Sequence, residues 1–144
     1  MPPTELDAFS SALLEFLRAT RRMRGRIGDE GELSLSQYHL LEPLLNDERL
    51  ATCELALAAG VSAPTATRML SGLAREGLVE RVPCEDDRRV VHVVLTGDGR
   101  ARVLAKRARG DARRAEIFAS LSAGERREAA RLLERLADAV EGLR

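Results

Sequence analysis

The chain has 144 residues, 44% of them hydrophobic, and its 23 basic residues are matched by 23 acidic ones. A chain of this length can bury the core of one domain, whereas a zero net charge excludes attraction to nucleic acid through bulk positive charge. The spacing of the two cysteines and two histidines excludes a metal cluster or a disulfide framework, so we expect no metal and no cofactor.

The first residues carry no charged-then-apolar signal, and no apolar run approaches the roughly 18 residues that span a bilayer. We therefore expect a cytoplasmic protein without a membrane partner. The first helix is predicted from residue 4 to about residue 26, where apolar residues recur at helical spacing and Gly25 and Gly28 mark its end. Its apolar residues are Leu6, Phe9, Leu13, Phe16 and Leu17.

Ser34 and Gln37 have the spacing of a capping box, which predicts a second helix ending near Asn46. Thr52 is the predicted N-cap of a short third helix, and Gly60 is free to take the positive φ of its C-terminus.

A fourth helix is predicted directly after this turn, with Ser62 as its N-cap and Pro64 in its first turn. Its buried stripe comprises Ala66, Met69 or Leu70, and Leu73. Consequently Thr65, Thr67 and Arg68 are expected to face outward.

Gly77 ends the fourth helix, and residues 78–82 and 90–95 read as two strands joined by the polar segment 83–89. In the second strand Val91, Val93 and Leu95 alternate on one face and leave His92 on the other. A cap at residues 96–98 begins a fifth helix that runs to about Ser120. A second capping box, Ser122 with Glu125, begins the last helix, whose apolar stripe is Leu132, Leu136, Val140 and Leu143.

This order predicts a mainly α fold with a minor β component: a winged helix-turn-helix flanked by N- and C-terminal dimerisation helices. We expect the winged unit at residues 34–99, with a dimerisation helix and linker at 1–33 and two helices at 100–144. Residues 61–114 hold twelve Lys or Arg against seven acids, an excess of five. Positive charge is therefore concentrated in the middle of the chain.

A winged helix presents one helix to a DNA major groove and its charged loop to the neighbouring minor groove. Amides at the Ser62 helix start suit a phosphate, and Thr65, Thr67 and Arg68 can reach base edges or the flanking backbone. Arg68 is the best candidate for a guanine contact, and its alternatives are a phosphate contact or solvent.

A longer pattern of residues runs through the third and fourth helices, the two strands and the start of the fifth helix. It also includes Ser34, Gln37 and Tyr38. Its other members are Leu55, Ala56, Gly60, Val61, Ser62, Pro64, Thr65, Thr67, Arg68, Leu73, Gly77, Leu78, Val79, Arg81, Asp87, Arg89, Val93, Leu95, Thr96 and Gly99. Over about residues 33 to 105 this pattern resembles the MarR (multiple antibiotic resistance regulator) family of bacterial transcription factors.

The resemblance implies a homodimer, formed by interlocked terminal helices, that binds a pseudo-palindromic operator on double-stranded DNA and usually represses. Half-sites one helical turn apart, roughly 34 Å, fit such a dimer. It also implies that Arg89 enters the minor groove, oriented by an ion pair with Asp87, beside Arg88. Two alternatives stay open: the terminal stripes pack on each other within one subunit, and the wing is a solvated turn.

Members of the family commonly bind small anionic or phenolic effectors between the dimerisation helices and the winged unit. The resemblance thus implies a cleft formed by the first, second and fifth helices. Tyr38, His39 and the arginines from Arg18 to Arg26 are its candidate lining, although these residue types equally serve as packing residues or a solvated face.

Two features depart from the family pattern. Ser71 and Gly72 lower the helix propensity of the recognition helix, and Pro83 with three consecutive acids could shorten the wing. Peroxide-sensing members carry a cysteine near the first helix, which this chain lacks. We expect Cys53 to be partly buried and Cys84, the only plausible redox candidate, to be incidental.

No catalytic residues are predicted, because the sequence contains no Ser-His-Asp set, phosphate-binding glycine loop or metal cluster. The rival function is a protein-protein interaction module, since winged helices also bind proteins. A basic face joining Arg68, Arg88 and Arg89 would favour DNA, whereas an apolar patch over the recognition helix would favour a protein partner.

Overall fold

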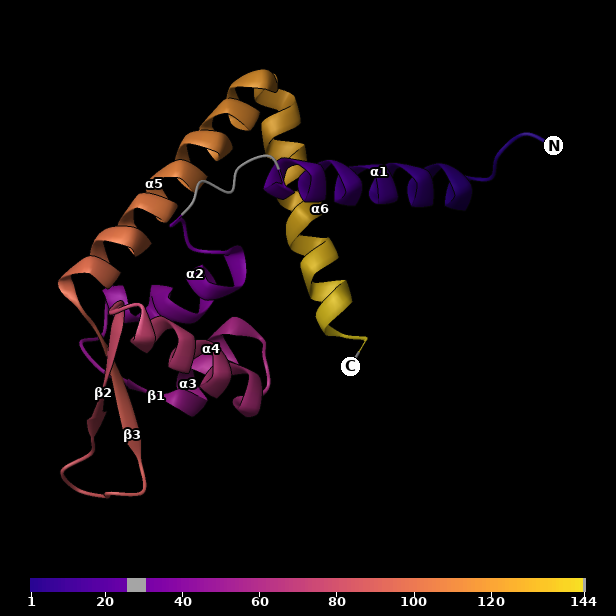
Figure 1. Cartoon of the computed structure of the whole chain (residues 1–144). Coiled ribbons are helices and arrows are strands. Elements are labelled where there is room, and N and C mark those ends of the chain that lie inside the picture. The colour runs from indigo at the N-terminus through magenta and orange to yellow at the C-terminus, as the bar shows by residue number, and fades with distance from the viewer. Residues whose placement is uncertain (26–30, 144) are drawn as a thin grey trace.

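The computed structural model describes residues 1–25 and 31–143 (Figure 1). Its helices are α1 (Glu5–Gly25), α2 (Leu35–Leu41), the 3-10 helix η1 (Glu42–Leu45), α3 (Thr52–Ala59), α4 (Ala63–Arg75), α5 (Gly97–Ser120) and α6 (Ala123–Glu141). Its strands are β1 (Leu50–Ala51), β2 (Val79–Pro83) and β3 (Val91–Leu95). The predicted mainly α winged helix-turn-helix is confirmed.

The strands form an antiparallel sheet in the order β1-β3-β2. Val79 pairs with Leu95 and Pro83 with Val91, so β2 and β3 form the wing, while Leu50 of β1 pairs with Val93. The sequence did not predict β1, because two residues are too few to show an alternating pattern.

The hydrophobic core lies inside the winged unit and the first turns of α5. Its buried residues are Leu33, Leu40, Leu41, Leu44, Leu55, Ala56, Ala66, Leu70, Leu73, Leu78, Val79, Val93 and Val103. Leu70 is fully buried and Met69 only half-buried, which decides the alternative that the sequence left open. Val93 is buried as expected, but Val91 is 39% exposed because it lies towards the wing tip, beyond the core.

The helix ends follow local side-chain chemistry. Ser34 with Gln37 and Ser122 with Glu125 form the predicted capping boxes, and Ser62 and Thr96 cap α4 and α5. Thr52 was the wrong N-cap for α3: Ala51 holds that position, and its N–H donates to Glu54 Oε2 at 2.8 Å.

The second predicted helix is divided at Pro43. Proline lacks an N–H and its ring clashes with the carbonyl four residues earlier, so the α-helical bonding of α2 gives way to the 3-10 turn η1. Gly60 adopts the predicted left-handed conformation, with φ 66°. Gly28 lies outside the described residues.

A close contact fixes α5 to the winged unit. Thr96 Oγ1 accepts a hydrogen bond from the Gly99 N–H at 3.0 Å and donates one to the Gly77 carbonyl at 2.7 Å. A Cβ on Gly99 would lie 1.8 Å from the Leu78 carbonyl oxygen. Glycine is therefore required for this approach of α5 to the start of β2.

Figure 1 shows α5 rising from the winged unit, α6 folding back from its far end, and α1 projecting away. No helix within the described ranges has the length and apolar content needed to cross a membrane.

Candidate nucleic-acid interface and adjoining pocket

The start of α4 presents polar groups to solvent. Ser62 Oγ accepts from the Thr65 N–H at 3.3 Å, and its hydroxyl donates to Thr65 Oγ1 at 2.8 Å. Pro64, Thr67 and Arg68 are exposed, as predicted. Thr65 is only half-buried rather than fully outward, because its hydroxyl lies against the cap.

The wing carries the predicted ion pair. Asp87 Oδ1 accepts from the Arg89 backbone N–H at 3.0 Å and from Arg89 Nε at 3.2 Å. The Arg89 side chain is nevertheless 91% exposed, and Arg88 beside it is also exposed. Two arginines thus project from the wing tip, one of them restrained by Asp87.

Arg81 is a residue of this surface that the sequence reasoning missed. Its Nη2 donates to the Thr67 carbonyl at 3.2 Å and to Ser71 Oγ at 2.7 Å, which joins β2 to α4. Ser71, read from the sequence as a loss of helix propensity, also donates its hydroxyl to the Thr67 carbonyl at 2.9 Å. Arg81 is one of the residues that carry the family resemblance, but no local spacing in the sequence indicates its contact with Ser71.

A hollow of about 380 Å³ separates α4 from the wing. Its lining is Ala51, Thr52, Cys53, Thr67, Arg81, Arg89, Val90 and Val91. Cys53 is exposed here and Cys84 is half-buried, so the expectation that Cys53 is the partly buried cysteine was wrong: position 53 lies at the open start of α3.

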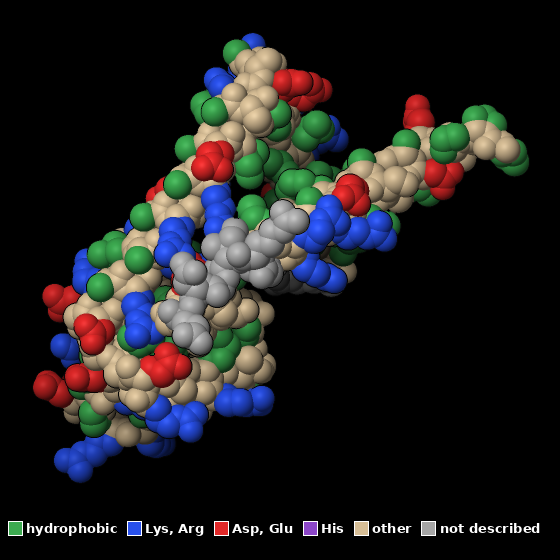
Figure 2. Space-filling model, turned by 45° about the horizontal axis from the view of Figure 1, so that its top comes forward, with side chains coloured by type: hydrophobic (Ala, Val, Ile, Leu, Met, Phe, Trp, Pro, Cys, Tyr) green, Lys and Arg blue, Asp and Glu red, His purple; other side chains and the backbone are tan. Residues whose placement is uncertain are grey.

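Exposed arginines occupy this end of the molecule, namely Arg68, Arg81, Arg88 and Arg89. Figure 2 shows Lys and Arg side chains along the lower edge, where α4 and the wing lie in Figure 1. In the part of the chain that the structure describes, α4 has no exposed large hydrophobic side chain, and those nearby are the separate Leu57 and Val91. The surface therefore has the character expected for DNA rather than for an apolar protein contact.

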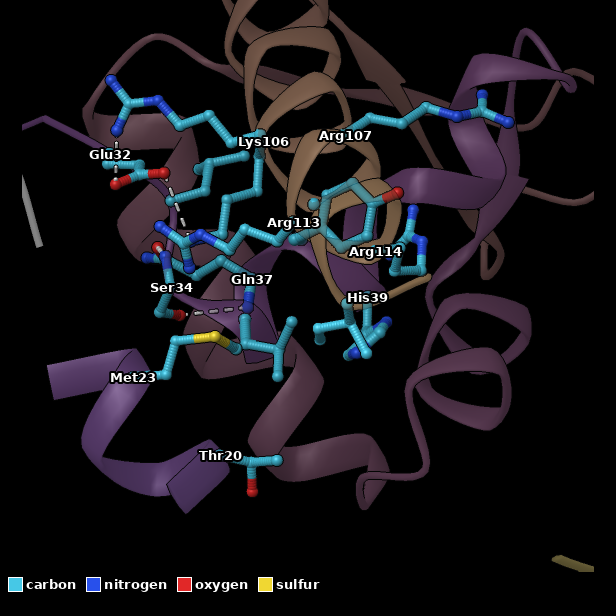
Figure 3. A pocket seen from close by; sticks show the side chains of 16 residues that line it. Thr20, Met23, Glu32, Ser34, Gln37, His39, Lys106, Arg107, Arg113 and Arg114 are labelled. Carbon is cyan, nitrogen blue, oxygen red and sulfur yellow. Dashed lines mark hydrogen bonds and ion pairs between the residues drawn. The ribbon is translucent and has the colours of Figure 1, made fainter. Parts of the chain in front are cut away.

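A second hollow, of about 600 Å³, lies between α1, α2 and α5 (Figure 3). Tyr38 and His39 line it, as predicted, together with Thr20 and Met23 of α1. Its cations come from α5 and are Lys106, Arg107, Arg109, Arg113 and Arg114.

Three of the arginines that the sequence analysis expected in this pocket do not line it. Arg18, Arg21 and Arg22 are exposed on α1, and Arg22 pairs with Glu15 at 2.6 Å. The side chain of Arg24 and the whole of Arg26 lie outside the described residues. The helix that turns its basic face towards α2 is α5 and not α1.

The pocket contains one partly buried carboxylate among these cations. Glu32, whose side chain is only 10% exposed, lies 3.4 Å from Lys106 Nζ and 3.0 Å from Arg109 Nη1. In Figure 3 Arg113 extends from α5 towards Glu32 and Lys106, whereas Arg107 extends in the opposite direction.

Tyr38 is an aromatic residue of the pocket lining. Its hydroxyl donates to Glu42 Oε1 at 2.8 Å, and its ring centroid lies 5.5 Å from that of His39. Burial, with the Glu42 hydrogen bond added, raises the pKa of the Tyr38 phenol above its ordinary value, although Arg107 and Arg114 oppose the shift.

Fold and surface together define a DNA-binding protein of the winged helix-turn-helix class. Comparisons with known proteins extend this result. The sequence model of the MarR family matches residues 33–91. Over 132 residues the chain is 34% identical to an uncharacterised HTH-type transcriptional regulator of Mycobacterium bovis, covering 90% of this chain and 92% of that protein.

The HTH-type transcriptional repressor YetL of Bacillus subtilis is 38% identical over 73 residues, or 49% of this chain and 44% of that protein. Among solved structures, the PcaV transcriptional regulator from Streptomyces coelicolor is similar with a TM-score of 0.77 and 25% identity, covering 92% of this chain and 98% of that one. The chain belongs to the MarR family of transcriptional regulators, a family of regulators rather than enzymes.

Proposed function

We propose that this regulator is a homodimeric repressor that binds a pseudo-palindromic operator and is released by a small anionic effector. The observation that carries the proposal is the shared surface of α4 and the wing, where Arg68, Arg88 and Arg89 are all exposed. Phosphate contacts from such residues fix position on the duplex, and base contacts give specificity.

Within this interface each residue has a proposed task. The backbone amides of Ser62 and Ala63 bind a phosphate at the positive end of the α4 dipole, whereas the Thr65 N–H is already bonded to the Ser62 cap. Thr65 and Thr67 contact the flanking backbone or base edges, and Arg68 contacts a guanine. Arg89 enters a narrow minor groove, where negative potential is concentrated, and Asp87 holds it in place through their ion pair.

The homodimer is supported by apolar surface that one subunit leaves uncovered. The stripe residues of α1 and α6 are exposed, with exposed fractions from 36% at Leu136 to 71% at Leu6, and Leu143 just beyond α6 is 85% exposed. Contiguous apolar surface on this scale marks an interaction site. A two-fold dimer through these helices places two winged units on one duplex.

Effector release is supported by the pocket between α1, α2 and α5. The pocket lies between α1, one of the two helices proposed for dimerisation, and the winged unit. Among the described residues that line it, five are cations of α5 and one, Glu32, is an acid. Arg113 and Arg114 are the proposed anion contacts, with Tyr38 and His39 as aromatic lining. Repression follows the usual mode of the family and the name of the relative YetL.

The decisive experiment selects bound sequences from random DNA with purified protein. We expect enrichment of an inverted repeat, and a steep fall of affinity with salt because Lys and Arg contacts release counterions. A selection that yields no inverted repeat would reject the proposal of operator binding.

A second experiment tests the wing. Arg89→Ala should weaken operator binding and reduce the slope of log affinity against log salt by about one phosphate equivalent. Arg75→Ala is the matched control, because this exposed arginine lies at the other end of α4. Equal affinity and slope for Arg89→Ala and wild type would remove the wing from the interface.

A further inference from the structure

Arg81 occupies a position between the recognition helix and the wing. It lies on β2 opposite Val93 of β3, and its side chain crosses to α4. The two hydrogen bonds from Nη2, to the Thr67 carbonyl and to Ser71 Oγ, hold the guanidinium against the helix. The side chain is therefore positioned before any ligand arrives.

The charge of this guanidinium is not compensated by its partners. Both acceptors are neutral, and across residues 1–25 and 31–143 no ion pair to Arg81 is present. Arg89 by contrast pairs with Asp87, and Lys106 pairs with Glu32. Arg81 is exposed, so its charge faces solvent in the hollow beside Arg89.

The guanidinium also keeps donors in reserve. An arginine side chain has five N–H donors, and the two bonds to α4 both come from Nη2. The N–H groups of Nε and Nη1 thus remain for an anion in the hollow. Oxygen acceptors that carry negative charge form the strongest bonds with such donors.

We propose that Arg81 binds a DNA backbone phosphate in the hollow between α4 and the wing. This inference rests on the proposed operator binding, and adds a contact that the interface described above lacks. A strand that runs from the recognition helix to the wing crosses this hollow. Because Arg81 is tied to the helix surface, it contacts the backbone and not base edges, and little side-chain entropy is lost on binding.

Ser71 offers a test that leaves Arg81 in place. Ser71→Asp supplies a carboxylate to pair with the guanidinium, whereas Ser71→Asn is its neutral match. We expect Ser71→Asp to reduce the salt slope by about 0.9 per subunit relative to Ser71→Asn. Affinity for operator and for random-sequence duplex should fall by a similar factor, about tenfold, because a phosphate contact carries no sequence information.

Arg81→Gln completes the cycle, because its amide still donates to the Thr67 carbonyl without a charge. Arg81→Gln should reduce the salt slope by the same amount as Ser71→Asp. Adding Ser71→Asp to Arg81→Gln should reduce the slope and the affinity little further. Persistence of the full Ser71→Asp effect in the Arg81→Gln background would mean direct repulsion of DNA and overturn the assignment. So would equal slopes for Ser71→Asp and Ser71→Asn.

Thermal unfolding of each variant identifies any that fails to fold. If Arg81→Gln does not fold, the comparison of Ser71→Asp with Ser71→Asn decides alone. Failure of the proposed operator binding gives a different result from failure of the Arg81 assignment. In that case the wild-type protein itself shows no salt-dependent binding to the selected repeat or to random duplex.

Discussion

At the scale of single residues, Gly99 and Thr96 explain why the sequence Leu-Thr-x-x-Gly follows the wing. Thr96 caps α5 and also donates a hydrogen bond to the carbonyl of Gly77. Gly77 follows the end of α4 and has a φ of 75°. Gly99 then allows the α5 backbone to meet the Leu78 carbonyl. One hydroxyl and one missing Cβ therefore set the direction in which α5 leaves the winged unit.

We expect Gly99→Ala to destabilise the protein by roughly 1–3 kcal/mol, because the added methyl must displace backbone rather than a flexible side chain. Urea unfolding followed by circular dichroism measures the change. Gly97→Ala is the control, since nothing lies within 4 Å of its Cβ position. Equal stability of the two variants would contradict the close approach of α5.

The same residues show what the sequence could predict. The caps at Ser34, Ser62 and Ser122 join groups three residues apart, so local spacing was sufficient to find them. Arg81 and Glu32 act through tertiary contacts: Glu32 meets Lys106 74 residues later. Helical or strand periodicity carries no information about which charged side chains meet across the fold, and both residues were missed.

At the scale of elements, α5 is bonded to the segment that leads into α2. Arg102 Nη1 donates to the Gly31 carbonyl at 2.8 Å, and Lys106 and Arg109 lie beside Glu32. Spacings of three and four residues place these cations on one face of the helix. A ligand that competes for them would alter the attachment of α5 to the winged unit.

Glu32→Gln tests this competition. Removing the carboxylate takes one negative charge out of the pocket, so we expect benzoate to bind about tenfold more tightly. Calorimetric titration measures the affinity, with neutral benzyl alcohol as the comparison ligand and Glu15→Gln on α1 as the control variant. A gain that is equal for benzoate and benzyl alcohol would exclude the electrostatic explanation.

Tyr38 gives the pocket a spectroscopic reporter, because it is the only tyrosine and the chain has no tryptophan. Its raised pKa means that the folded state favours the neutral phenol. The contribution of this preference to the free energy of unfolding is fully present at pH values below the pKa of the phenol in the unfolded state. It is lost as the pH rises through the pKa of the phenol in the folded state. Phenolate absorbance should therefore develop above the ordinary value of 10.0.

Glu42→Gln should lower the pKa of Tyr38 towards that ordinary value, because it removes the carboxylate that accepts a hydrogen bond from the phenol. Glu15→Gln, on the outer part of α1, should leave the titration unchanged. An unchanged titration in Glu42→Gln would show that burial alone controls this phenol.

At the scale of the whole molecule, the core and the apolar surface lie in different places. Every buried hydrophobic residue of the described chain falls between Leu33 and Val103, and neither α1 nor α6 contributes one. The amphipathic pattern predicted both terminal helices. It could not predict whether their stripes pack within one subunit or against another, because the pattern is the same in both cases; in this subunit they remain exposed.

Breaking the proposed dimer should therefore spare the core. Leu132→Glu places a charge in the α6 stripe, where the side chain is 42% exposed in the single subunit, so the free energy of folding the winged unit should change little. Sedimentation equilibrium should show a shift from dimer to monomer. Operator affinity should fall steeply, because two linked winged units bind with an effective concentration that a monomer lacks.

Glu134→Lys is the matched control, since two residues of helix turn this exposed position to the opposite face of α6 from Leu132. It should remain dimeric and keep its operator affinity. A Leu132→Glu protein that stays dimeric would place the subunit contact elsewhere. One that becomes monomeric yet binds the operator with unchanged affinity would show that a single winged unit is sufficient for recognition.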